Sequence, residues 1–190
     1  MRNRTAGFTI IEVLFVALAL GAVTAAFFYA MSAGQISFNL SSSKIKLQAQ
    51  VRNLTAWITK DAHQAVSWDI ANNNPGPGYI KLRQVTGWDS QNNSFLWSDY
   101  YIEYTYDADL STITRRTSDL SNNTLMTWTF DNITAAPFFT VNSSGSPVAL
   151  NANDLLTSKK LIITITGQNQ VIGFQPVVYS LTEEVQIRNG

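Results

Sequence analysis

The sequence predicts an α+β fold in which one long N-terminal helix packs on an antiparallel β-sheet. Three features lead to this prediction: an apolar run near the start, an amphipathic stretch that continues it, and a second half that alternates polar and apolar residues. A helix and a sheet with one apolar face each bury those faces against one another. With 190 residues, 45% of them hydrophobic, the chain is long enough for one ordinary domain plus an anchor.

The first element is the apolar segment 8–33, in which Glu12 is the one side chain that is charged at neutral pH. About 25 residues at about 1.5 Å each form a helix of roughly 37 Å, enough to cross a hydrocarbon core of about 30 Å. Arg2 and Arg4 precede the segment and no basic residue follows it before Lys44, so the positive-inside rule predicts a cytoplasmic N-terminus. We expect a single-pass protein of the inner (plasma) membrane whose C-terminal domain is periplasmic.

A secretory signal peptide also has a basic start followed by an apolar run. Its apolar region is usually about 7 to 15 residues long and carries no acid, whereas this segment is longer and contains Glu12. The small residues of Ala30-Met31-Ser32 resemble a cleavage site. A secreted domain released by signal peptidase is therefore the less favoured alternative to a membrane anchor.

The helical pattern continues through residues 34–71 as an amphipathic half. Apolar residues recur there at steps of three, four or seven with basic residues between them, which is typical of a helix with one covered face. No Gly or Pro interrupts residues 35–71, and the turn formers of residues 72–78 end the run. We therefore predict one continuous helix from about residue 8 to about residue 70. The apolar stripe consists of Ile36, Leu40, Leu47, Val51, Leu54, Ile58 and Ala62.

Residues 72–190 predict an antiparallel β-sheet domain. Two stretches, 99–107 and 125–130, alternate apolar and polar residues, which is typical of half-buried strands. Residues 135–154 are rich in turn formers and predict a long connection. The apolar faces comprise Tyr100, Ile102, Tyr104 and Tyr106 in the first stretch and Met126, Trp128 and Phe130 in the second. Further strands are predicted at 79–85, 111–117 and 161–166, and around 177–181 and 184–188.

The composition argues against several kinds of function. The chain has no cysteine, so it carries no disulfide framework and no thiolate metal site. Its 13 basic and 13 acidic residues form no basic stripe, and we expect no nucleic-acid partner unless the chain serves DNA uptake. The sequence contains no HExxH, P-loop, GxGxxG or G-x-S-x-G pattern. We expect no catalytic residue, no metal, no cofactor and no enzymatic activity.

Three other groups of side chains have both a structural and a functional interpretation. The single histidine, His63, lies on the amphipathic stretch, where a solvated residue is favoured over a catalytic one. Asp107 and Asp109 could bind calcium through oxygen, but no EF-hand spacing follows and a hairpin turn is favoured. For the tryptophans and the tyrosine-rich strand, cross-strand packing is favoured over a platform for a sugar or another ligand.

Small residues recur at steps of four on one face of the apolar segment, as Ala17, Gly21 and Ala25. This pattern permits close approach of a second helix in lipid or in a filament core. The abundance of alanine in the segment is the alternative explanation. The segment contains no proline, so Gly21 is the one evident weak point of the helix.

Glu12 needs a partner, because a carboxylate within a bilayer segment costs several kcal/mol unless it is paired or protonated. The alternative is that its side chain reaches back to the membrane surface.

The run Gly7-Phe8-Thr9, with Glu12 three residues later, follows a short basic leader and opens an apolar helix. It resembles the signal of type IV pilins and type II secretion pseudopilins. The resemblance implies a pilin-like fold, a leader peptide of residues 1–7 that prepilin peptidase removes after Gly7, and methylation of Phe8. It also implies that Glu12 attracts the N-terminal amine of a neighbouring subunit, which stays charged below a pKa of about 8. The implied partners are prepilin peptidase, other pilins or pseudopilins, the inner-membrane assembly platform, and the lipid bilayer before assembly.

Two further stretches, residues 57–68 with Asp61 and Ala65 and the terminal residues 182–190, resemble PilW-like minor pilins and J-type pseudopilins. This resemblance implies a minor, structural subunit that primes or joins a type IV pilus or a type II secretion filament. An outward-facing binding module, such as a tip adhesin or a DNA-uptake pilin, is the alternative from another functional class.

Overall fold

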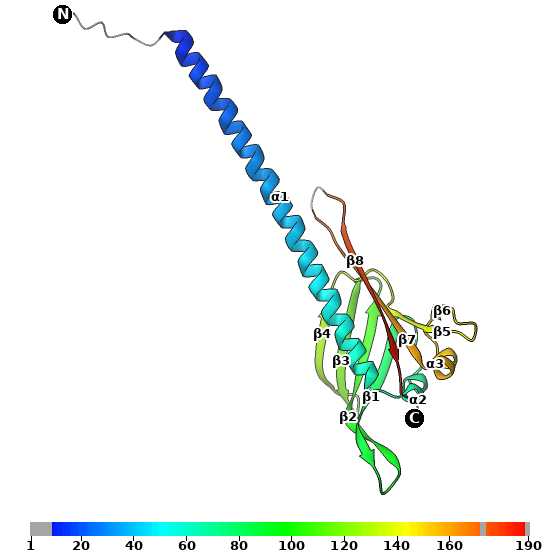
Figure 1. Ribbon diagram of the computed structural model, residues 1–190. Coiled ribbons are helices and arrows are strands. Elements are labelled where there is room, and N and C mark those ends of the chain that lie inside the picture. Colours follow the sequence, from blue (N-terminus) through cyan, green and yellow to red (C-terminus); the bar gives the residue numbers. More distant parts are fainter. Residues whose placement is uncertain (1–8, 172–173, 189–190) are drawn as a thin grey trace, which may run out of the picture. The chain divides into compact units, whose positions relative to one another are not determined.

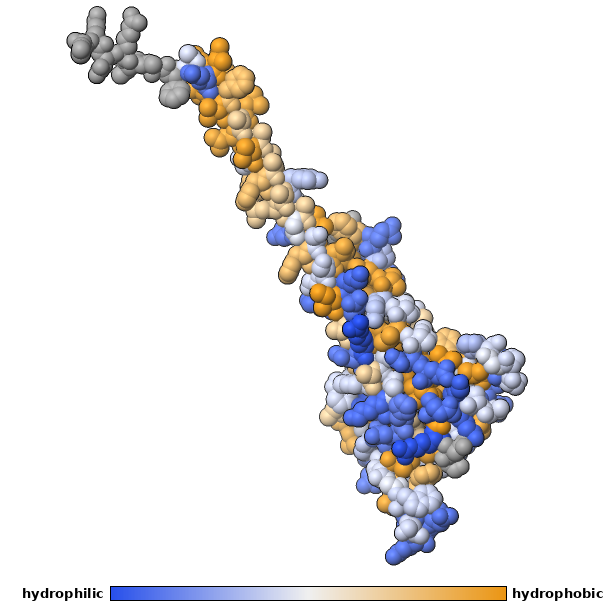
Figure 2. All heavy atoms as spheres, viewed as in Figure 1, coloured by the Kyte–Doolittle hydropathy of each residue, from blue (hydrophilic) through white to orange (hydrophobic). Residues whose placement is uncertain are grey.

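The first element of the structure is a 54-residue helix, α1, at Ile10–His63 (Figure 1). The structure is a computed structural model that describes residues 9–171 and 174–188. The chain divides into two units, residues 1–42 and residues 43–190. Residues 10–42 of α1 bury no side chain, and apolar residues cover this part of the helix (Figure 2). The helix is long and apolar enough to cross a membrane, consistent with a single membrane span or a signal sequence.

The helix ends at His63 rather than near residue 70, so the prediction of one continuous helix is wrong at this end. Val66 has an extended backbone, with φ −117° and ψ 142°, and a separate short helix, α2, follows at Ser67–Asn72. The carbonyl of Gln64 accepts a hydrogen bond from the backbone N–H of Val85, at 2.8 Å. A tertiary hydrogen bond therefore replaces a helical one at the point where the chain turns, and tertiary context overrides helix propensity.

The strands form two four-stranded antiparallel sheets rather than one (Figure 1). The predicted α+β class and the antiparallel pairing are confirmed, and the long apolar helix with antiparallel sheets is a pilin-like architecture. The first sheet has the order β1 (Tyr79–Asp89), β2 (Ser94–Asp107), β3 (Thr112–Asp119), β4 (Thr124–Phe130). The second has the order β6 (Pro147–Ala149), β5 (Phe138–Val141), β7 (Lys160–Asn169), β8 (Val177–Gln186).

The second sheet corrects two predictions. Residues 135–154, expected as a connection, contain β5, β6 and the start of helix α3 at Ala152–Ser158. The side chain of Asn151 begins this helix by accepting a hydrogen bond from the backbone N–H of Asp154, at 3.0 Å. The segments expected around 177–181 and 184–188 are one strand, because pairing with β7 continues without interruption from Val177 to Gln186.

The stripe on α1 forms part of the hydrophobic core from Leu47 onward. Ile36, by contrast, is 41% exposed. Close approach of α1 to β7 depends on Gly167, because a Cβ at that position would lie 2.7 Å from Leu47 Cδ1 and 3.0 Å from Val51 Cγ2. The core combines α1 with both sheets. It includes Val51, Leu54, Ile58, Ile80, Leu82, Ile102, Tyr104, Ile163 and Ile165.

Alternation along the chain predicts half-buried strands, and in the first sheet this prediction holds for β2 but not for β4. The tyrosine face of β2 is confirmed, since Ile102 and Tyr104 are buried. In β4, an edge strand that pairs only with β3, Leu125 is 60% exposed and Met126 is 49% exposed. The prediction of a half-buried strand is therefore wrong for most of β4.

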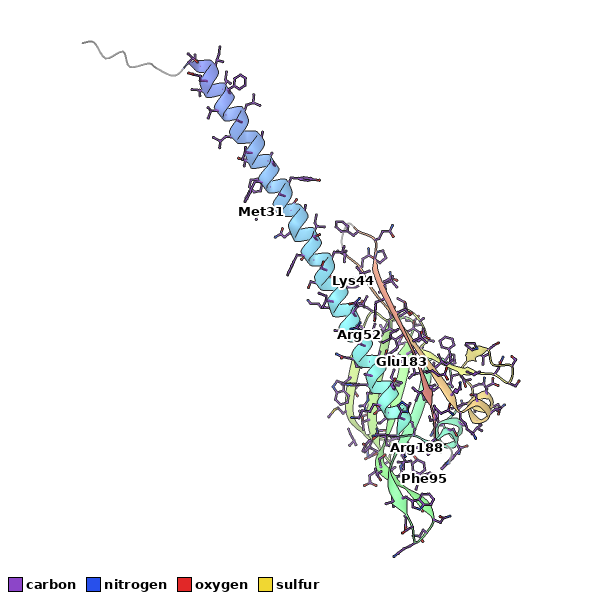
Figure 3. All side chains as sticks on the ribbon, viewed as in Figure 1. Met31, Lys44, Arg52, Phe95, Glu183 and Arg188 are labelled. Atoms are coloured by element: carbon purple, nitrogen blue, oxygen red, sulfur yellow. The ribbon has the colours of Figure 1, made fainter. Side chains whose placement is uncertain are left out.

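The β1–β2 hairpin extends beyond the rest of the first sheet (Figures 1 and 3). Pairing between β2 and β3 begins only at Tyr100, whereas β1 and β2 pair as far as Asp89 and Ser94. Register shifts between Arg83 and Gly87 mark the point at which the hairpin leaves the sheet.

Candidate functional sites on α1 and the first sheet

Glu12 lies in the first turn of α1 and folds back onto Thr9. Its Oε2 accepts hydrogen bonds from the backbone N–H of Thr9, at 2.9 Å, and from the Thr9 hydroxyl, at 3.1 Å. The Thr9 hydroxyl oxygen lies 3.4 Å from the backbone nitrogen of Glu12, which donates to it. This reciprocal arrangement is a capping box, in which two side chains satisfy backbone groups at the start of a helix. The sequence contained the signal, because T-x-x-E has the spacing of that motif.

Glu12 thus stabilises the start of its own helix, a role that was not among the expectations from the sequence. An acidic side chain also interacts favourably with the positive end of the helix dipole. Both hydrogen bonds from Thr9 reach the same oxygen, Oε2, and within residues 9–171 and 174–188 Oε1 of Glu12 has no hydrogen-bond donor. The carboxylate can therefore cap its own helix and still accept a donor from another molecule.

Gly7 and Phe8, the residues expected to be processed, lie outside the described residues. Ala17, Gly21 and Ala25 are exposed on α1, and a Cβ at Gly21 would meet nothing within 4 Å. The helix passes through Gly21 without a break. Close packing of these small residues against a second helix stays a prediction.

Asp61 is the second carboxylate of interest on α1, and it is buried where the helix meets the first sheet. Its Oδ2 accepts hydrogen bonds from the hydroxyl of Tyr104, at 2.6 Å, and from Nε and Nη2 of Arg115, at 3.0 and 2.9 Å. Its Oδ1 accepts a hydrogen bond from Gln84, at 3.0 Å. Side chains of β1, β2 and β3 thus converge on one residue of the helix, and a charge buried in this way is tolerated because it is paired.

The pKa values of the partners are consistent with an ionic cluster. Burial raises the pKa of the Tyr104 hydroxyl well above its usual range, and the charge of Asp61 raises it further. Burial by itself would lower the pKa of Arg115, but Tyr104 and Asp61 outweigh that effect and raise it. Tyr104 therefore stays neutral and donates a hydrogen bond to Asp61, while Arg115 stays protonated.

Two tryptophans enclose the guanidinium group of Arg115. Its Cζ lies 5.5 Å from the ring centre of Trp57 on α1 and 5.2 Å from that of Trp128 on β4, within the range of cation–π attraction. Together with Lys60 and Asp61 they line a hollow of about 220 Å³. Because Asp61 already pairs with Arg115, this cluster is a structural junction between α1 and the first sheet rather than an open binding site.

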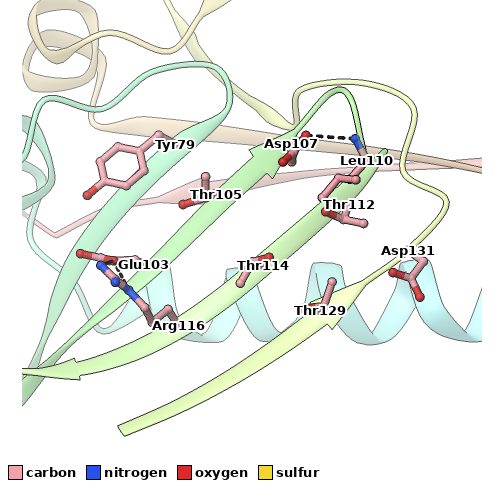
Figure 4. Close-up of a pocket in the computed structure, with 10 residues that line it drawn as sticks. All are labelled: Tyr79, Glu103, Thr105, Asp107, Leu110, Thr112, Thr114, Arg116, Thr129 and Asp131. Carbon is pink, nitrogen blue, oxygen red and sulfur yellow. Dashed lines mark hydrogen bonds and ion pairs between the residues drawn. The ribbon is translucent and has the colours of Figure 1, made fainter. Parts of the chain in front are cut away.

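A larger hollow, of about 830 Å³, lies on the face of the first sheet that points away from α1 (Figure 4). Glu103 is buried at one end, where it pairs with Arg116 and with Lys81, the latter at 3.0 Å. Threonines from β2, β3 and β4 line the middle of the hollow, and Tyr79 lies at its margin. Burial raises the pKa of Tyr79, and the negative charge of Glu103 adds a smaller increase. This hollow could not be predicted from the sequence, because the residues that line it lie far apart along the chain.

The remaining predicted side chains do not form a site. His63 is exposed at the last turn of α1. Oδ1 of Asp107 accepts hydrogen bonds from the backbone N–H groups of Asp109 and Leu110, both at 3.0 Å, which confirms the hairpin turn between β2 and β3. Within the described part of the chain, no three His, Cys, Asp or Glu side chains are grouped as metal ligands would be.

We compared the chain with protein-family models, curated proteins and solved structures. None of these comparisons finds a match.

Proposed function

We propose that the chain is a minor pilin or pseudopilin, a structural and non-catalytic subunit of a type IV pilus or a type II secretion filament. In this proposal prepilin peptidase removes residues 1–7 and methylates Phe8. The anchored subunit resides in the inner membrane, with its N-terminus cytoplasmic and residues 43–190 in the periplasm, until it joins the filament.

One observation carries the proposal: the first half of α1 is apolar, uncovered and acidic at its start. None of the side chains of residues 10–42 is buried, and Glu12 is the one charged residue before Lys44 in this part of the helix. Exposed apolar surface of this extent needs lipid or other protein surfaces around it. Lipid before assembly and neighbouring helices after assembly would both cover it.

The geometry of Glu12 supports a role between subunits. Its carboxylate caps the helix through Oε2, which leaves Oε1 for a donor that the described residues do not supply. The amine created at Phe8 by removal of the leader is a donor of the right charge. A hydrogen bond between two charged groups contributes about 1.5–3 kcal/mol, enough to favour one register of adjacent helices over others.

The polar residues of this half of α1 are consistent with a span in lipid. The hydroxyl of Thr24 donates to the carbonyl of Leu20 at 2.7 Å, and that of Ser32 donates to the carbonyl of Tyr29 at 3.3 Å. Hydroxyls that bond to their own helix need no water.

The choice of a minor subunit of the PilW-like or J-type kind rests on residues 57–68 and 182–190. Within the first stretch, Asp61 and Ala65 are buried where the helix meets the sheets. The residues that carry the resemblance are therefore ones on which the fold depends.

The N-terminus of the exported protein tests the proposal. Intact-mass measurement of the chain, purified from membranes or from sheared filaments, should give a protein that begins at Phe8 and carries one added methyl group. A Gly7→Val variant should retain residues 1–7, because a branched side chain at the cleavage position hinders an extended backbone. A chain that begins near Ala33 would contradict the proposal and indicate ordinary signal peptidase.

A further inference from the structure

A continuous line of aromatic and charged side chains runs along the β1–β2 hairpin and the strands behind it, and we call it the outer strip. Its end at Glu103 lies at the hollow of Figure 4. The outer strip consists of Trp88, Phe95, Trp97, Arg83, Tyr101 and Lys81, and it ends at Glu103.

Each member of the outer strip contacts the next. At the hairpin, the ring centres of Trp88 and Phe95 lie 5.2 Å apart, and those of Phe95 and Trp97 lie 6.0 Å apart. Arg83 then lies over the rings of Trp97 and Tyr101, at 6.0 and 5.8 Å from their centres. At about 3.3 Å per residue, the part of β1 beneath the strip is roughly 20 Å long.

The far end of the strip joins the hollow. Nζ of Lys81 lies 4.5 Å from the ring centre of Tyr101 and 3.0 Å from Oε1 of Glu103, which lines the hollow. An elongated ligand could therefore contact aromatic rings at the hairpin and hydroxyl and charged groups beyond them.

The aromatic part of the strip is accessible and held in place. Trp88 is 52% exposed, and Trp68 of α2, which packs on Trp97 with ring centres 5.5 Å apart, is 41% exposed. A two-stranded ribbon in water is only marginally stable by itself, and these edge-to-face ring contacts stabilise it. Rings fixed by one another lose little conformational entropy when a ligand binds.

The charged groups of the strip favour an uncharged ligand over a polyanion. Nε of Arg83 already donates to the carbonyl of Ser98 at 2.6 Å, and Lys81 pairs with Glu103. Nucleic-acid binding by stacking needs cations that are free to contact phosphates, and these two are engaged within the protein.

We propose that the outer strip binds a neutral, extended glycan. Sugar rings present C–H groups that pack on aromatic faces, while their hydroxyls both donate and accept hydrogen bonds. The rings of the strip match the first property. The threonines and Tyr79 of the hollow match the second. The inference concerns a binding activity that does not depend on processing or assembly.

Binding of cellohexaose and chitohexaose to the purified full-length chain in detergent tests this inference. We expect saturable quenching of tryptophan fluorescence and binding by calorimetry, little changed between low and high salt because the ligand is neutral. Trp88→Ala should weaken binding about tenfold, the scale of losing one aromatic contact of about 1.4 kcal/mol. The matched control is Met126→Ala, which removes a similarly exposed side chain from β4 and should leave binding unchanged.

Three results would overturn the inference: no binding of either oligosaccharide, equal binding by the wild type and Trp88→Ala, or preferential binding of a single-stranded oligonucleotide that weakens steeply with salt. Circular dichroism of Trp88→Ala confirms that the hairpin variant is folded. A chain that binds the oligosaccharides but keeps residues 1–7 would support the glycan inference and contradict the proposed function. A chain that loses residues 1–7 but does not bind the oligosaccharides would support the proposed function and contradict the glycan inference.

Discussion

The two halves of α1 differ in where their apolar surface finds its partners. Residues 10–42 bury no side chain, whereas residues 43–63 bury seven against the two sheets. The second half is therefore explained by contacts within the chain. The first half exposes apolar side chains of comparable size. In water, each Å² of exposed apolar surface would cost about 25 cal/mol of free energy relative to its burial. The first half of α1 therefore needs a partner outside the chain, such as lipid or another protein.

The two carboxylates of α1 show the same difference at the level of single residues. Asp61 receives hydrogen bonds from Tyr104, Arg115 and Gln84, all in the same unit of the chain. Glu12 receives hydrogen bonds only from Thr9 within the described residues. One acid is fully paired by the fold, and the other has capacity left for a second molecule.

The largest effect should come from removing the internally paired acid. Asp61→Ala leaves the half-buried Arg115 without its counter-charge, and we expect a loss of about 3 kcal/mol in the free energy of unfolding. Urea denaturation of the full chain in detergent, followed by tryptophan fluorescence, measures it. The control is Glu184→Gln, which breaks the exposed pair with Lys160 and should cost less than about 1 kcal/mol. Equal losses for the two variants would contradict the importance of the buried cluster.

The contact between α1 and β7 should be nearly as sensitive. Gly167→Val introduces atoms where a Cβ alone would lie 2.7 Å from Leu47, and overpacking of this kind costs about 1–3 kcal/mol. Gly76→Ala is the matched control, because a Cβ there meets nothing within 4 Å. If thermal unfolding gave the same midpoint for both variants, α1 would not pack on β7 as closely as described.

Alkaline pH should destabilise the folded protein through Tyr104. The pKa of Tyr104 is raised in the folded state, whereas the unfolded side chain ionises near about pH 10. Above that pH the unfolded chain binds fewer protons than the folded chain, so stability falls as pH rises, by about 1.4 kcal/mol per pH unit for this group. Tyr104→Phe should make the slope of stability against pH shallower in this range. An unchanged slope would show that Tyr104 ionises normally.

The smallest effect should come from the cap at the start of α1. Thr9→Ala removes the hydroxyl of the capping box and should cost about 1 kcal/mol of local helix stability. Amide hydrogen exchange of residues 10–13 in detergent should be about fivefold faster, while exchange in the core of residues 43–190 stays unchanged. Because Thr9→Ala keeps the charge of Glu12, we expect incorporation into filaments to be preserved.

Much of the fold could be predicted because the strongest sequence patterns are local. The long apolar run and the stripe from Leu47 to Ala62 depend on helical periodicity, and the structure agrees with both. The end of α1 could not be predicted, since Gln64 leaves the helix to bond with Val85, which is distant in sequence. The exposure of β4 likewise depends on which other elements cover its two faces, and alternation does not encode that.

The candidate sites show the same limit, with one exception. The partners of Asp61 and the hollow around Glu103 come from three or four strands, so no spacing along the chain could reveal them. The two helix caps are the exception. Each cap is formed by two residues three positions apart, namely Thr9 with Glu12 and Asn151 with Asp154. A search of the sequence for the capping motif would identify both pairs.

The most direct test of the account is the behaviour of Glu12→Gln in cells. Glutamine can still form the capping box, so this change removes the charge while it preserves the helix start. The account predicts normal removal of residues 1–7 and a loss of incorporation into sheared filaments of about tenfold or more, as expected for a charge-assisted bond between subunits. Incorporation equal to that of the wild type would contradict the account and leave Glu12 as a helix cap alone.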